Sequence, residues 1–118
     1  MSYDLDFWKY KPGISLDHPF VYERLTEGEH VEGLEELPIE MMLSRLEELF
    51  SDGWAQSDVL HYESDDRGVF QIFTTAQFFR VDCYGMSGED MNRFIDLGKE
   101  FGCPLYDPQV ETRYDGNG

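Results

Sequence analysis

The pattern of hydrophobic and polar residues changes its period several times along the chain. Residues 3–9 alternate between two faces, which predicts a half-buried strand that ends at the Lys-Pro-Gly turn of residues 11–13. One face of this strand would carry the side chains of Tyr3, Leu5 and Phe7, and the other those of Asp4, Asp6 and Trp8.

Three segments predict helices. Residues 37–50 place apolar side chains at helical spacing, with acidic residues between them. The last helix would begin at Ser87 as its N-cap, with Asp90 completing a capping-box-like pair. A shorter helix would begin at Asp17, with Pro19 in its first turn.

Strands predicted between and after these helices define the fold class. Residues 59–63, 69–74 and 77–84 are joined by short links and would pair as an antiparallel meander. Short strands would follow at 103–106 and 110–114, and residues 115–118 would form a flexible tail. We therefore expect one α+β domain over residues 1–118, with helices on one face of a mainly antiparallel sheet. A ferredoxin-like βαββαβ arrangement with an extra strand and right-handed crossovers is the specific topology predicted.

Composition restricts the classes of partner. The chain has 118 residues, of which 41% are hydrophobic and 15% aromatic, so its charge belongs to a folded body. The net charge is −16, from 25 acidic against 9 basic residues. Such a charge disfavours binding to nucleic acid and to anionic membranes, and it favours a cationic partner. Simple solubility accounts for the acidity equally well.

Residues that could support catalysis or metal binding are few. The three histidines stand at no recognisable metal or triad spacing, and the acidic hairpin around residues 63–68 does not fit a calcium loop. Asp4 and Asp6 would lie about 7 Å apart on one strand face, a spacing that a cation or a glycosidase could use and that a solvated strand explains as well. Cys83 and Cys103 are expected to be buried free thiols. We therefore expect no enzyme activity, no cofactor and no metal.

The outward face of the strands is the most informative candidate site. If alternate residues of 77–84 point to the helices, then Arg80, Asp82 and Tyr84 point away from them. Together with Asp4, Asp6 and Trp8 of the first strand, they would form an aromatic and acidic surface typical of protein binding. Either Gln71 and Phe73 or their neighbours Phe70 and Ile72 would join this surface. The alternative is that the first helix or a second copy of the chain covers this face.

Several short segments look familiar together: Met-Ser-Tyr-Asp-Leu at 1–5, Leu-Pro-Ile-Glu at 37–40, Phe-Gln-Ile-Phe at 70–73, Asp-Cys-Tyr-Gly-Met at 82–86 and Gly-Cys-Pro-Leu-Tyr-Asp-Pro-Gln at 102–109. In this the chain resembles small bacterial immunity proteins of polymorphic and contact-dependent toxin systems. The resemblance implies a cytoplasmic antitoxin that covers the active site of a basic toxin domain, such as a nuclease.

A second function stays open beside the immunity function. The chain could be a cytosolic regulatory or scaffold module that binds another protein or itself, without catalysis. The N-terminal segment has no basic start and no apolar run, so no signal peptide is expected and a cytoplasmic location is predicted. The sequence leaves open whether the chain is a monomer or a homodimer.

Overall fold

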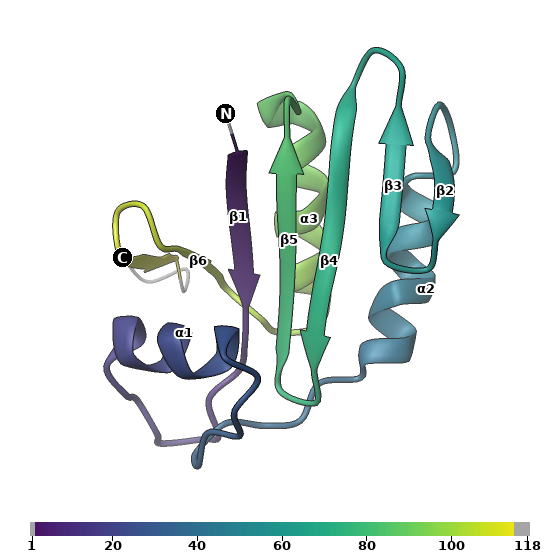
Figure 1. The fold of residues 1–118 in the computed structure, drawn as a ribbon. Helices are drawn as coiled ribbons and strands as arrows, with labels where there is room; N and C mark the ends of the chain where they lie inside the picture. The colour runs from purple at the N-terminus through teal and green to yellow at the C-terminus, as the bar shows by residue number, and fades with distance from the viewer. Residues whose placement is uncertain (1, 115–118) are drawn as a thin grey trace.

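An antiparallel sheet of seven strands forms the centre of the structure, a computed structural model that describes residues 2–114 (Figure 1). The predicted flexible tail at 115–118 lies outside the described residues. The strands are β1 (Ser2–Phe7), β2 (Ala55–Asp58), β3 (His61–Ser64), β4 (Gly68–Thr75), β5 (Phe78–Tyr84), β6 (Leu105–Asp107) and β7 (Thr112–Tyr114). The helices are α1 (His18–Thr26), α2 (Ile39–Leu49) and α3 (Gly88–Glu100). The predicted α+β class and single domain agree with this arrangement.

The order of the strands does not confirm the ferredoxin-like topology. The order is β2-β3-β4-β5-β1-β6-β7, and β1 pairs antiparallel with both of its neighbours, β5 and β6. A βαβ unit with a right-handed crossover needs a parallel pair, and the described strands pair only in antiparallel fashion. The reason is visible in Figure 1: β2 starts at the far edge in the same direction as β1, and three hairpins then reverse the chain before β5.

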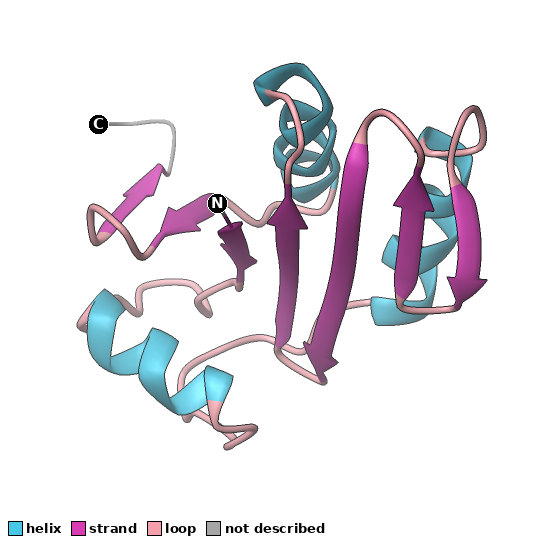
Figure 2. Ribbon diagram, turned by 45° about the horizontal axis from the view of Figure 1, so that its top comes forward, coloured by secondary structure: helices cyan, strands magenta, loops and turns pink. Residues whose placement is uncertain are grey.

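The helices cover both faces of the sheet, although the sequence predicted them on one. Helices α2 and α3 lie behind the sheet and α1 lies in front of it, near the end of β1 (Figures 1 and 2). The main core forms between α2, α3 and the sheet, with Leu5, Phe7, Phe79 and Val81 pointing into it. A second, smaller cluster joins α1 and the loop after it to the front of the sheet.

The ends of the helices show why they form where they do. The Asp17 carboxylate accepts a hydrogen bond from the Phe20 amide at 3.2 Å, and Ser87 Oγ accepts one from the Asp90 amide at 3.2 Å. Both N-caps were predicted from the sequence. The Asp90 side chain also forms an ion pair with Arg67, 2.7 Å away in the hairpin between β3 and β4. That pair fixes the hairpin to the start of α3.

Helix α3 and β1 approach each other closely at one glycine. A Cβ atom added to Gly98 would lie 2.5 Å from the ring of Phe7 and 2.7 Å from the Cys103 carbonyl oxygen. Ordinary van der Waals separation is about 3.5–4.0 Å, so no larger side chain fits here without movement. The glycine therefore sets the distance at which α3 packs on the sheet.

No helix among residues 2–114 is long and apolar enough to cross a bilayer.

Candidate partner-binding face

All six residues that the sequence assigned to the outward face lie on the same side of the sheet. Strand pairing places Asp4 opposite Asp82 and Asp6 opposite Arg80, while the residues between them point to the main core. The alternation of each strand and the contact between β1 and β5 therefore bring four charged residues into one group. Tyr84 lies at one end of this group, and Trp8 directly follows β1 at the other.

Two of the six predicted surface residues are not at the surface. Asp6 and Trp8 both have 0% of their area exposed. Trp8 lies in the second cluster with Val21 and Leu25 of α1, and its ring centroid is 5.0 Å from that of Tyr106. The prediction that these two side chains are exposed is wrong, because the apolar side of α1 covers this half of the face. The alternative stated above, cover by the first helix, is confirmed for that half.

The buried carboxyl group of Asp6 is the most perturbed acid in this group. Neither of its oxygens accepts a hydrogen bond from the described residues, and a side-chain hydrogen bond with Asp4 is one of the causes that favour its protonated form. Burial, followed by the neighbouring charge of Asp4, raises the pKa of Asp6 to about 9, and the Arg80 guanidinium opposes this only in part. Asp6 is therefore a neutral carboxylic acid at neutral pH. Its burial lowers the free energy of unfolding by an amount that grows as the pH rises.

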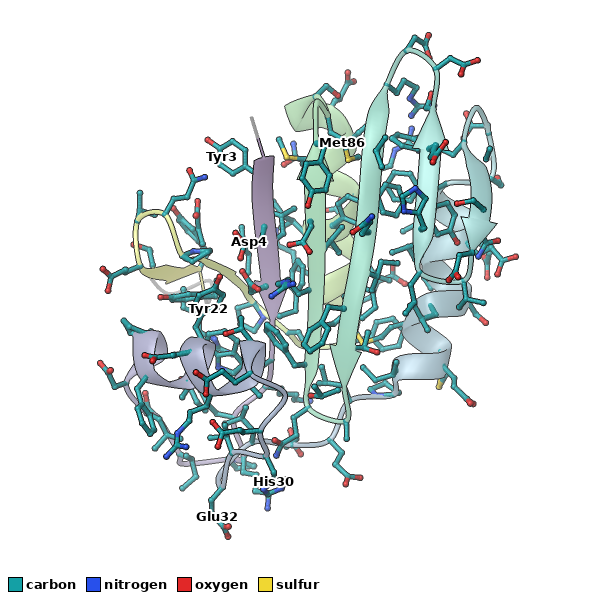
Figure 3. All side chains as sticks on the ribbon, viewed as in Figure 1. Tyr3, Asp4, Tyr22, His30, Glu32 and Met86 are labelled. Carbon is teal, nitrogen blue, oxygen red and sulfur yellow. The ribbon has the colours of Figure 1, made fainter. Side chains whose placement is uncertain are left out.

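Asp4 stands at the border between the covered and the uncovered part of the face. The Tyr22 hydroxyl of α1 donates a hydrogen bond of 2.7 Å to Asp4 Oδ2, and Figure 3 labels both residues. Burial and this hydrogen bond to Asp4 raise the pKa of Tyr22, so the phenol stays protonated and remains a donor. The bond ties α1 to the central strand at the edge of the second cluster.

Arg80 and Asp82 are partly engaged with each other. Arg80 Nε lies 3.1 Å from Asp82 Oδ1, and the guanidinium stands over the Phe73 ring, 5.0 Å from its centroid. Both charged side chains are half-buried. Burial raises the pKa of Asp82 even though the nearby Arg80 lowers it. The pair holds Asp82 in place beside the uncovered part of the sheet.

The uncovered part of the sheet lies over β3, β4 and β5, and we call it the open face. Strand register aligns His61 with Gln71, Gln71 with Asp82 and Asp82 with Asp4, which gives a polar row across four strands. Gln71 Nε2 is 3.1 Å from His61 Nδ1, and His61 Nε2 is 2.9 Å from Glu63 Oε1. The open face consists of His61, Glu63, Val69, Gln71, Asp82 and Tyr84.

Sequence reasoning missed His61 and Glu63 as members of this face and left the side of Gln71 undecided. Tyr62 between the first two is buried, so they point outward together, and Gln71 lies between the buried residues Phe70 and Ile72. The alternation of the strand at 69–74 contained this signal, but only the strand register shows which residues stand side by side. Tyr84, predicted as an aromatic anchor, is 43% exposed.

Most basic side chains are paired with carboxylates, so the unpaired charges on the surface are mainly negative. Within residues 2–114, at least six of the nine Lys and Arg residues form ion pairs with carboxylates within 4.0 Å. The positive charge is thus largely compensated inside the molecule, while exposed acids without a basic neighbour remain on its surface. With a net charge of −16, the molecule carries a negative potential over its surface.

The described residues were also examined for metal-ligand groups and reactive cysteines. No group of three or more His, Cys, Asp or Glu side chains in residues 2–114 is arranged to hold a metal ion. Cys83 and Cys103 are buried free thiols, as the sequence predicted. Burial raises the pKa of Cys83 to about 12 and that of Cys103 to about 11, so both remain protonated and weakly nucleophilic at neutral pH.

Comparison with models of protein families, with curated proteins and with solved structures gave no significant match to this chain.

Proposed function

We propose that this chain binds a basic protein partner through the open face and acts as an immunity-type inhibitor of a cationic toxin domain. The observation that carries the proposal is the open face itself, an uncovered part of the sheet that combines acidic side chains with an exposed tyrosine. Tyrosine is enriched among residues that dominate binding energy, and acidic neighbours select a basic partner.

The toxin would be covered and not chemically altered. Toxin domains that cleave nucleic acid hold phosphates with basic residues, so an acidic inhibitor is their electrostatic complement. Such a protein works in the cytoplasm, where the toxin would act. A catalytic role of Asp4 and Asp6 is disfavoured, because a substrate cannot reach the buried carboxyl of Asp6 while α1 covers it.

Co-expression with a basic toxin domain encoded beside this chain tests the proposal. The chain should restore growth of the host, and the complex should bind more weakly as salt rises, since screening reduces charge attraction. The double variant Glu63→Lys with Gln71→Lys places two positive charges on the open face and should lower affinity at least tenfold.

The double variant Asp96→Lys with Asn92→Lys is the matched control, because it makes the same change in charge at two exposed residues of α3 on the opposite side of the sheet. It should leave affinity within about twofold. Equal losses in both variants would mean that only the total charge matters, and an unchanged affinity in the open-face variant would exclude the open face. Either result would refute the proposal as stated.

A second candidate is a module that associates with itself, and the edge of the sheet favours it. Strand β2 pairs only with β3 among the described strands, and all four of its residues are exposed. An uncovered edge can accept a strand from another chain, although β2 is short and has an irregular register that discourages this. Light scattering distinguishes the two functions: a stable dimer without partner favours self-association, and a monomer favours the inhibitor.

A further inference from the structure

A groove on the helical side of the molecule stands apart from the open face. It runs between α2 and the C-terminal end of α3, with a volume of about 400 Å³. Helices α2 and α3 lie on the side of the sheet that faces away from α1 (Figure 1). Its lining residues are Glu40, Met41, Ser44, Arg45, Glu48 and Phe101.

The floor of the groove is apolar and exposed. Met42 and Leu46 form the buried stripe of α2, whereas Met41 lies beside that stripe and remains 64% exposed. The half-buried ring of Phe101, just after α3, borders the same groove. Methionine is unbranched and adapts to different apolar partners, which makes it frequent at recognition surfaces. The groove can therefore receive one apolar side chain of a partner.

The rim of the groove is acidic. Arg45 is the basic residue of the lining, and its guanidinium is shared by Glu100 at 3.1 Å and Glu48 at 3.3 Å. Glu40 adds an exposed carboxylate at the other end of the lining. Two carboxylates thus contact the guanidinium, and a third, that of Glu40, lines the groove beside its apolar floor. A complementary ligand presents positive charges on either side of an apolar side chain.

We propose that this groove binds a short basic segment of a protein partner, which inserts one aliphatic side chain between Met41 and Phe101. A second copy of this chain is a poor occupant, because its own surface is acidic and would repel the rim. The inference does not rest on the proposed function, since the open face lies on the other side of the sheet.

A titration followed by amide NMR shifts tests this inference. The probe is a blocked peptide, Lys-Lys-Leu-Lys-Lys, and its matched control replaces the central Leu with Ser. We expect the largest shifts within residues 40–48 and 99–102, and a Kd at least threefold weaker for the Ser peptide. Met41→Lys, which adds a positive charge to the floor, should weaken binding of the Leu peptide about tenfold.

Two further variants make the result specific. Met41→Ala leaves the charge unchanged and should weaken binding about threefold, because it removes only part of the apolar floor. Val59→Lys is the control, as it places the same charge at another exposed apolar residue, 62% exposed and on the turn between β2 and β3. It should leave the Kd within about twofold.

Four outcomes would overturn the inference. Shifts spread over all acidic surfaces, or equal binding of the Leu and Ser peptides, would show attraction by charge alone. Shifts centred on β3, β4 and β5 would assign the peptide to the open face, which would support the proposed function and exclude the groove. An unchanged Kd in Met41→Lys, with a folded spectrum, would exclude the groove directly.

Discussion

Asp6→Asn should stabilise the protein at neutral pH, because it removes a carboxyl group that the fold keeps in its neutral form. The pKa of Asp6 is raised from 3.8 to about 9, so the folded state binds a proton that the unfolded state has released. This group contributes most favourably below pH 3.8, and its contribution is lost progressively as the pH rises toward 9. The asparagine amide is isosteric and does not titrate.

The magnitude follows from the distance between the unfolded pKa and the pH of the measurement. Between 3.8 and neutral pH lie about 3 pH units, and each corresponds to about 1.4 kcal/mol, which gives roughly 4 kcal/mol at pH 7. The Asn variant should therefore gain up to about 4 kcal/mol relative to the native chain at pH 7, and almost nothing near pH 4. Unsatisfied amide groups would reduce this gain by about 1–2 kcal/mol.

Urea unfolding followed by tryptophan fluorescence at pH 5, 7 and 8.5 measures this difference, since Trp8 is buried and becomes exposed on unfolding. The matched control is Asp96→Asn, at an exposed position on α3. It should change the free energy of unfolding by less than about 0.5 kcal/mol at each pH. If Asp6→Asn is less stable than the native chain at pH 7, or if the difference does not grow with pH, the account of Asp6 is wrong.

Two other substitutions test contacts that hold the fold together. Gly98→Ala should destabilise by about 1–3 kcal/mol in urea unfolding, because its Cβ overlaps β1, whereas Gly88→Ala meets no atom within 4 Å and should be close to neutral. A neutral Gly98→Ala would show that α3 can shift away from the sheet. Asp90→Asn should lower stability at pH 7 by about 1–2 kcal/mol, because it removes the pairing that lowers the pKa of Asp90. The Asp90 contribution is present above the unfolded pKa and lost as the pH falls below it, so a difference that persists unchanged at pH 2.5 would contradict the ion-pair account.

Helix positions could be predicted from sequence because their signals are local. The caps at Asp17 and Ser87 involve residues three positions apart in the chain. Strand β2 was missed for the opposite reason: its residues, Ala-Gln-Ser-Asp, are all exposed, so no alternation between buried and exposed positions marks it. Its formation depends on pairing with β3, and hydrophobic periodicity contains no information on that contact.

The sequence predicted which residues share the candidate face, but it did not predict that α1 covers half of that face. Alternation assigned Asp6 and Trp8 correctly to the face opposite the main core. It could not show that Val21 and Leu25, on a helix 9 residues long, would pack against that face. The short apolar stripe of α1 fits either side of a sheet equally well. Which side it covers is decided by the connections that lead from β1 to α1 and back, and these are tertiary properties.

The segment formed by β1 and Trp8 packs against both faces of the sheet, and for this reason it tolerates no change in length. Phe7 fills the main core, while its neighbours Asp6 and Trp8 belong to the opposite face. Inserting or deleting a single residue between positions 4 and 8 would exchange the two faces, placing a carboxyl group in the main core and an aromatic ring beside Tyr22. Length variation in this protein should therefore be confined to its loops, and the central strand should remain constant in length even where its individual residues change.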